Sequence, residues 1–135
     1  MRTITVETSG KDQVLDITER VADVVRDEAG QRQDGGASGA CLVFAAHTTC
    51  AVTTADLDPG TDRDLLQALR SLLGKQSYRH PHDPSHTPDH ILSSLIGPSV
   101  LVPYADGRLL LGTWQRVVLV ELDGPRQRAL HIGCL

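Results

Sequence analysis

Aromatic residues, lysine and long apolar runs are all scarce in this chain. Only four of the 135 residues are aromatic, too few for the stacked platforms that bind single-stranded nucleic acid. A net charge of −4 also argues against a nucleic-acid partner, because phosphate backbones are bound by clustered positive charge. No apolar stretch approaches the ~20 residues that cross a bilayer, and no leader sequence opens the chain. We therefore expect a cytoplasmic protein with neither a membrane nor a nucleic-acid partner.

Cysteine is also scarce, with residues at positions 41, 50 and 134 and no Cys-x-x-Cys pair. An odd count without a spacing motif argues against a disulfide framework and predicts buried, reduced thiols. Cys50 stands close in sequence to His47, but nothing in its local sequence would lower the thiol pKa as a nucleophile requires. We interpret Cys50 as a small buried residue.

The hydrophobic pattern predicts a single α+β domain over residues 1–135. A chain of this length can bury roughly two-thirds of its surface, and 40% of its residues are hydrophobic. Period-two alternation and β-branched runs predict strands, whereas apolar residues at helical spacing predict helices. The expected strands are 3–6, 14–17, 41–46, 48–54, 100–104, 108–111, 116–122 and 127–134, and the expected helices are 16–29, 65–73 and a short one at 89–95. We predict a largely antiparallel sheet or sandwich of about seven or eight strands covered by two main helices.

Local signals mark the ends of several of these elements. Asp16 and Glu19 resemble a capping box at the start of the first helix, and Gly30 is a natural stop for it. Residues 30–39 hold four glycines among polar side chains, which predicts a flexible surface loop. Asp106-Gly107 is a strong hairpin signal between two of the expected strands.

Histidine is the residue type that points most directly to chemistry, with four of the six histidines between positions 80 and 90. His47 ends a predicted buried strand and is followed by two threonines, so rigid backbone would hold its ring. Zinc and similar ions favour neutral imidazoles, commonly three with one position open for water. The spacing matches no compact local metal motif. A satisfied core histidine and a polar surface loop therefore remain the alternatives to a metal site.

Three other polar or aromatic residues are candidates for a site. Asp56 follows the strand after His47 and is either a ligand or base, or an ordinary turn residue. Glu121 interrupts the apolar run 117–122, and we expect it at an edge position facing solvent. Trp114, within residues 112–115, either lies in a bulge that aims it into a pocket or fills the core.

Five stretches of the chain together form a recognisable pattern in order and spacing. They are His47-Thr48-Thr49, Tyr78-Arg79-His80, Asp89-His90-Ile91, SSLIGPS at 93–99 and DGRLLLGTWQ at 106–115. With these stretches the chain resembles the YjbQ-like family, small proteins known as secondary thiamine-phosphate synthases. The pairing of Leu-Ile-Gly-Pro-Ser with Leu-Gly-Thr-Trp-Gln is the most specific part, and the resemblance runs over essentially the whole chain.

The resemblance implies a compact α+β fold, a homotrimer and a pocket built around histidines near subunit boundaries. His47, His80 and His90 occupy the family's histidine positions. They are therefore the expected ligands of a divalent metal ion, zinc or magnesium, and His47 and His90 are also expected catalytic residues. His82 and His86 stay with the surface-loop interpretation.

The resemblance also implies the residues that contact substrate. Trp114 and Gln115 occupy the family's Trp-Gln position, and the full expected set is Thr48, Thr49, Arg108, Trp114 and Gln115. Asp56 joins the expected catalytic residues, but it stands where the family usually has an Asn-Glu-Asn type segment, and its side chain is one methylene shorter than Glu. Relatives also have an Asn-Ala pair where this chain has Pro88-Asp89.

The activity implied by the resemblance joins hydroxymethylpyrimidine diphosphate to a thiazole phosphate and releases pyrophosphate. Such a transferase needs positive charge or hydrogen-bond donors for the leaving group and room for two flat heterocycles. One alternative is a metal-dependent hydrolase of a small phosphorylated metabolite, which would use the same histidines. Another is a trimeric protein that binds a metal or ligand without turnover, since the sequence contains no evident pair of nucleophile and base.

Overall fold

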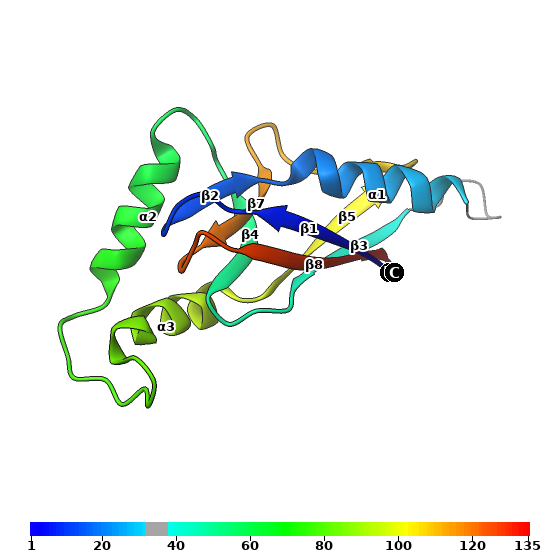
Figure 1. Ribbon diagram of the computed structural model, residues 1–135. Helices are drawn as coiled ribbons and strands as arrows, with labels where there is room; N and C mark the ends of the chain where they lie inside the picture. The colour runs from blue at the N-terminus through cyan, green and yellow to red at the C-terminus, as the bar shows by residue number, and fades with distance from the viewer. Residues whose placement is uncertain (32–37) are drawn as a thin grey trace.

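The computed structural model describes residues 1–31 and 38–135, so most of the loop expected at 30–39 lies outside the described residues. The described part is an α+β fold with two antiparallel sheets (Figure 1). In chain order its elements are β1 (Arg2–Glu7), β2 (Gln13–Asp16), α1 (Thr18–Gly30), β3 (Gly39–Ala45), β4 (Cys50–Ala55), α2 (Thr61–Leu72), the short 3-10 helix η1 (Pro84–His86), α3 (Thr87–Ile96), β5 (Ser99–Ala105), β6 (Arg108–Leu109), β7 (Arg116–Glu121) and β8 (Gln127–Cys134).

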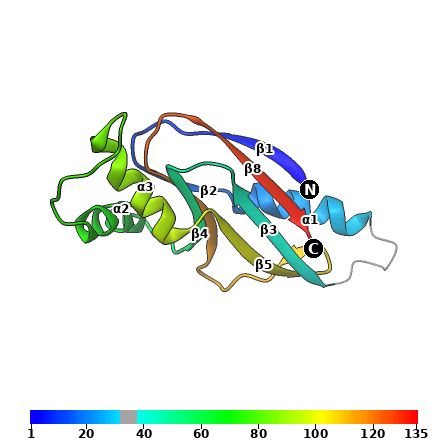
Figure 2. The same ribbon diagram turned by 90° about the horizontal axis from the view of Figure 1, so that it is seen from below.

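All strand pairs are antiparallel, as predicted. Five strands form one sheet in the order β1-β8-β3-β5-β6, and three form a second sheet in the order β2-β7-β4. Each expected strand is present within one or two residues of its predicted bounds, except that β6 is shorter. Because β1 and β8 pair antiparallel along their length, the two chain termini lie at the same end of the five-stranded sheet (Figure 2).

Strand β7 separates two hydrophobic cores, because its alternate side chains point to opposite faces. Val117 and Leu119 enter the first core, which lies between the two sheets and α1. Val118 and Val120 enter the second core, which α2 and α3 cover. Leu92 of α3 packs into this core. All five side chains are fully buried. This explains the unbroken apolar run in β7: a strand between two cores has no solvent-facing side.

Helix α1 begins at Thr18, two residues later than predicted, and the capping box of Asp16 and Glu19 is not formed, because the N-cap is Ile17. The Asp16 carboxylate accepts a hydrogen bond from the Thr18 N–H at 2.9 Å. Glu19 does not reach back; its carboxylate lies 3.4 Å from the Arg116 guanidinium, which also contacts Asp16. In a capping box the Glu19 carboxylate would accept from the backbone N–H of the N-cap residue; here it contacts Arg116, at the start of β7, instead. The apolar face predicted for this helix is buried at Val21, Val24, Val25 and Ala29.

Helix α2 contains the predicted leucine stripe but lies at the edge of the fold (Figure 1). None of its residues is fully buried, and Leu72 is 69% exposed. Leu66 and Leu69 are half-buried and cover the second core from one side. No helix within residues 1–31 and 38–135 combines the length and apolar composition needed to cross a membrane.

Two turns require glycine for different reasons. Asp106 and Gly107 both have positive φ, at 48° and 71°, so the β5–β6 hairpin has the turn that Asp-Gly predicts. At the β7–β8 turn the constraint is space: a Cβ on Gly124 would lie 2.1 Å from the Gly10 carbonyl oxygen and 2.8 Å from the Thr8 hydroxyl. Gly124 therefore lets the β7–β8 turn pack directly against the segment between β1 and β2.

We predict that Gly124→Ala lowers the free energy of unfolding by about 2 kcal/mol or more, because backbone must move to admit the methyl group. Chemical denaturation followed by circular dichroism measures the change. Gly30→Ala is the matched control: a Cβ there meets nothing within 4 Å, and Ala favours a helix end. Equal stability of the two variants would show that the β7–β8 turn is not tightly packed.

Candidate functional site

A cleft of about 510 Å³ collects most of the histidines where the end of β3, the segment before α3 and the β7–β8 turn meet. Its lining residues are Ala46, His47, Thr48, Thr49, His80, His86, His90, Asp123, Arg126 and Arg128. The structure thus brings together His47, His80 and His90, with both predicted threonines. It adds His86, which was predicted to lie in a surface loop. His82 contacts the edge of His80 without lining the cleft.

The remaining predicted site residues lie elsewhere. Asp56 and Trp114 line a second hollow of about 230 Å³ together with Asp16 and Arg116. Gln115 is exposed beside it, and Arg108 is exposed at the start of β6. Because β4 and β7 are antiparallel, with Cys50 opposite Glu121 and Ala55 opposite Arg116, the two hollows lie at opposite ends of this strand pair.

Trp114 is neither in a β-bulge nor in the core. Residues 112–115 form a tight turn in which the Gln115 N–H donates to the Gly112 carbonyl at 3.0 Å. The Gln115 side-chain oxygen in return accepts from the Gly112 N–H at 2.8 Å. The turn carries the chain from the five-stranded sheet to β7 and leaves Trp114 68% exposed.

His47 is held as a neutral ring with its proton on Nδ1. Its Nε2 accepts a hydrogen bond from the Ala129 N–H at 2.8 Å, so this nitrogen carries no proton. Burial lowers the pKa of the imidazole, and the nearby positive charge of Arg128 lowers it further. His47 therefore offers the cleft an N–H donor and no free lone pair.

His80 also accepts a backbone hydrogen bond, through the other ring nitrogen. Its Nδ1 accepts from the Asp83 N–H at 3.2 Å, so the N–H donor of this ring is at Nε2. The ring stacks on His90, with centroids 5.1 Å apart and an interplanar angle of 16°. His80 and His90 thus enter the cleft as a stacked pair.

This donor set does not fit the metal site predicted at His47, His80 and His90. A histidine binds a metal ion through an unprotonated nitrogen, and its other nitrogen carries the proton. In His47 and His80 the unprotonated nitrogen already accepts a backbone N–H. The two rings are arranged to donate hydrogen bonds, and donors are suited to oxyanions rather than to cations.

A different group, His86, Asp89 and Asp123, has ligand atoms within 4.8 Å of one another. A side-chain cation already occupies this group: the Lys11 ammonium donates to Asp89 at 2.5 Å and to Asp123 at 3.3 Å. Arg70, from α2, also contacts Asp89 at 2.6 Å. These ion pairs attach α2 and the start of α3 to the β7–β8 turn, so they hold the histidine-bearing segment against the cleft.

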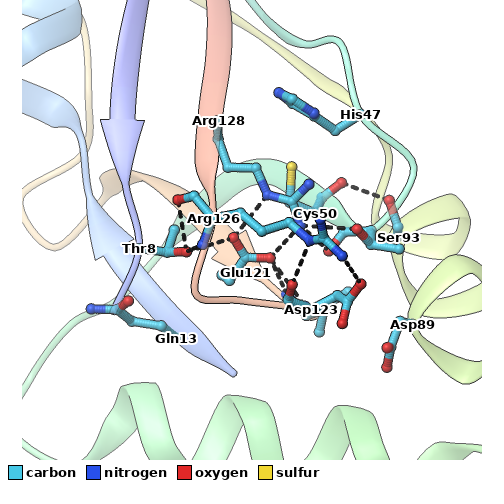
Figure 3. Close-up of polar contacts among 12 residues, drawn as sticks. Thr8, Gln13, His47, Cys50, Asp89, Ser93, Glu121, Asp123, Arg126 and Arg128 are labelled. Atoms are coloured by element: carbon cyan, nitrogen blue, oxygen red, sulfur yellow. Dashed lines mark hydrogen bonds and ion pairs between the residues drawn. The ribbon is translucent and has the colours of Figure 1, made fainter. Parts of the chain in front are cut away.

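Glu121 does not face solvent as the sequence analysis expected: its residue is fully buried, and β7 is the central strand of its sheet. Its carboxylate points across to β8 of the other sheet and contacts Arg128 through Nε, at 2.8 Å, and Nη2 (Figure 3). It also accepts from the Thr8 hydroxyl at 2.9 Å and the Asp123 N–H at 3.0 Å. Burial raises the pKa of Glu121, but the hydrogen bonds from Arg128, Asp123 and Thr8 outweigh it and hold the pKa below its usual value.

Arg126 and Asp123 form a second pair at the rim of the cleft. The Arg126 Nη2 lies 3.0 Å from the Asp123 carboxylate, and its side chain is 52% exposed. Burial opposes ionisation of Asp123, but hydrogen bonds from Arg126 and Lys11 more than compensate and lower its pKa. Each arginine in the cleft is therefore already paired with a carboxylate.

Cys50 lies beside the Arg128 side chain but is fully buried (Figure 3). Burial raises the pKa of its thiol to about 11, although the Arg128 charge acts in the opposite direction. It therefore remains a protonated thiol at neutral pH, which confirms the interpretation as a small buried residue. Cys41 is buried, and Cys134 lies opposite it on β8 and is half-buried.

The chain matches the family described as UPF0047 protein YjbQ-like over residues 2–135. It belongs to this family. It is 34% identical to the UPF0047 protein YugU of Bacillus subtilis over 98% of this chain and 96% of that protein. It is also 34% identical to a UPF0047 protein of Archaeoglobus fulgidus, covering 98% of both chains.

Solved structures of the family share this fold. A YjbQ/UPF0047 protein of Clostridium acetobutylicum superposes with a TM-score of 0.85 at 35% identity, and all of both chains is covered. A YbjQ-like protein of Sulfolobus solfataricus gives a TM-score of 0.86 at 30% identity, covering 98% of this chain and 94% of that one. These proteins are described as uncharacterised or of unknown function, so membership of the UPF0047 family defines the fold without defining a reaction.

We predict that Lys11→Met lowers the free energy of unfolding by about 1 kcal/mol at neutral pH, since half of the lysine side chain is exposed and solvent screens the pair. Asp123 has a lowered pKa, so its stabilising contribution is present above the unfolded pKa of about 4 and is lost as the pH falls through the folded pKa. The difference between variant and wild type should therefore shrink on acidification to about pH 3.

Denaturant titrations at several pH values measure this dependence. The matched control is Lys75→Met, because Lys75 is the other lysine of the chain and is exposed. A loss in Lys11→Met that stays constant from neutral to acidic pH, or an equal loss in Lys75→Met, would contradict the role assigned to Lys11.

Proposed function

We propose that the histidine cleft of this UPF0047 protein binds the phosphate or diphosphate group of a small metabolite. One observation carries the proposal: backbone N–H groups occupy the lone pairs of His47 and His80, so both rings present N–H donors. Arg126 and Arg128 line the same cleft. Oxyanions are bound by such convergent donors, and donors fixed before the reaction also stabilise a departing diphosphate.

The reaction we propose is that of the secondary thiamine-phosphate synthases, to which the sequence motifs point. The thiazole nitrogen attacks the methylene carbon of hydroxymethylpyrimidine diphosphate, so that a C–N bond forms. The C–O bond to the diphosphate breaks, and pyrophosphate leaves with the bonding electrons. The role of the chain is to hold the leaving group by hydrogen bonds; a divalent cation belongs to this scheme only as part of the substrate, carried by the diphosphate.

The homotrimer and the cytoplasmic location remain part of this proposal. An apolar surface supports the trimer: Phe44 and Leu101 are 37% and 57% exposed on neighbouring strands, and their side chains alternate with the buried Val43 and Val102. They thus lie on the face of the five-stranded sheet opposite the first core. An exposed apolar sheet face is typical of a surface that another chain covers.

The synthase proposal predicts that purified protein forms thiamine phosphate and pyrophosphate only when both substrates and magnesium are present. His47→Ala should lower this rate by about 100-fold or more, because a donor to the leaving group is lost. Thiamine phosphate is measured by chromatography after oxidation to a fluorescent product. Pyrophosphate or phosphate release without the thiazole would instead support the metal-dependent hydrolase, and binding without turnover would support a non-catalytic protein.

Amide substitutions distinguish histidines that donate hydrogen bonds to the ligand from histidines that bind a metal ion. Asn places its NH₂ near the position of His Nδ1 and Gln near that of Nε2, so His47→Asn and His80→Gln keep the donors but offer no metal-binding nitrogen. We expect these variants to bind pyrophosphate in the presence of EDTA within about 10-fold of wild type, whereas both Ala variants bind more weakly. Isothermal titration calorimetry measures the affinities.

His131→Asn is the control, because His131 contacts Thr3 outside the cleft. The donor assignment is wrong if EDTA abolishes pyrophosphate binding by wild type and the amide variants lose as much as the Ala variants. That result would make the rings metal ligands.

A further inference from the structure

Arg128 is the buried cation of the cleft. Its residue is only 3% exposed, whereas the Arg126 side chain is 52% exposed. Arg128 lies on the inner face of β8, in phase with the buried Leu130 and Ile132, and still lines the cleft. A guanidinium in such a position must have its donors satisfied, since a buried, unpaired charge is strongly destabilising.

Two of the three guanidinium nitrogens are fully engaged. Nε donates to Glu121 at 2.8 Å, and Nη2 donates to Glu121 and to the Thr49 carbonyl and hydroxyl at 3.2 and 2.9 Å. Nη1 donates to no residue within 1–31 and 38–135. Among these residues Thr87 Oγ1 is the one enclosed side-chain atom without a partner, so Nη1 is not enclosed. Because Arg128 lines the cleft, we infer that the cleft is where Nη1 is exposed.

We propose that Arg128 Nη1 is the fixed innermost contact for a phosphate oxygen of the ligand, and that Glu121 is the positioning residue that aims it. This inference rests on the proposed function and deepens it by naming the specificity-determining cation. Figure 3 shows the arrangement: the Arg128 side chain lies between Glu121 on one side and His47 on the other.

Glu121 fixes the direction of the donor rather than adding charge. Guanidinium is planar, so holding Nε and Nη2 on one carboxylate and on Thr49 leaves Nη1 a single orientation. The pair is formally neutral, and burying it costs desolvation that a pair of apolar side chains would avoid. A buried pair placed beneath a cleft, with one donor left open, is explained by ligand recognition better than by stability.

His47 completes the contact from the other side. Its Nδ1–H is a neutral donor, because Nε2 accepts the Ala129 N–H and the adjacent Arg128 charge disfavours a second proton. A cationic donor and a neutral donor beside each other suit an oxygen that carries partial negative charge, as in a phosphate ester or diphosphate. Lysine at position 128 would keep the charge but lose the fork that sets the direction.

The first test uses the wild-type protein and pyrophosphate as the probe. Side-chain nitrogen–proton spectra resolve buried arginines, and we expect the Arg128 Nη signal to shift on addition of pyrophosphate while the Arg126 signal moves little. In calorimetry Arg128→Lys should weaken pyrophosphate binding by at least ~10-fold, the loss expected for one charge-assisted hydrogen bond. The matched control Arg126→Lys should weaken it by less than ~3-fold.

The second test concerns Glu121. Glu121→Gln keeps the shape of the side chain and one acceptor oxygen, but its NH₂ cannot accept from the guanidinium, so the two-point contact that aims Nη1 is broken. The pyrophosphate-induced shift of Arg128 should therefore be reduced although circular dichroism still shows a folded protein. A purely structural role would leave that shift in place in the folded variant. If Arg128→Lys does not fold, the wild-type spectrum alone decides between the two results.

The outcomes separate this inference from the proposed function. Pyrophosphate binding by wild type that is lost in His47→Ala, with an unshifted Arg128 signal and normal affinity in Arg128→Lys, overturns the role of Arg128 and leaves the phosphate cleft standing. Absence of any pyrophosphate binding by wild type overturns both.

Discussion

The buried pair of Glu121 and Arg128 is the interaction on which the arrangement of the two sheets and the cleft depends. Glu121 ends β7 in the three-stranded sheet, and Arg128 is the second residue of β8 in the five-stranded one, so the pair links the two sheets that enclose the first core. Through Thr8 it also reaches the end of β1, and through Thr49 the start of β4. A pair that joins four strands restricts how the sheets meet, which hydrophobic packing alone does not do because apolar contacts are non-directional.

A second set of ion pairs positions the histidines around this centre. Lys11 and Arg70 neutralise Asp89, the buried residue directly before His90. Helix α2 contributes little buried area, so Arg70 contributes more to its attachment than its leucines suggest. Stability and site geometry are therefore coupled here, because the ion pairs that attach α2 also hold the start of α3, which carries His90.

Much of the fold could be predicted because strand alternation, helix faces and Asp-Gly turns are local signals, and the structure confirms the strands they mark. The prediction that Glu121 faces solvent was wrong. The apolar residues around Glu121 indicate a buried strand, but they do not identify Arg128 as the residue that pairs with its charge. One signal was available: Glu121 is in phase with Val117 and Leu119, so a charge on a core-facing position required an opposite charge elsewhere. The distance of Asp56 from His47 was readable, since the strand predicted between them at 48–54 rises about 3.3 Å per residue and places the two residues at its opposite ends.

The chemistry of a histidine cluster depends on groups that the sequence does not identify. An imidazole is a metal ligand or an N–H donor according to the partner of its second nitrogen. For His47 that partner is the N–H of Ala129, from a strand more than eighty positions later in the chain, and for His80 it is a local turn at Asp83. Both partners are backbone donors, which do not depend on side-chain identity. Sequence motifs alone therefore assign the same three rings equally well to zinc or to phosphate, and the direction of two backbone N–H groups favours phosphate.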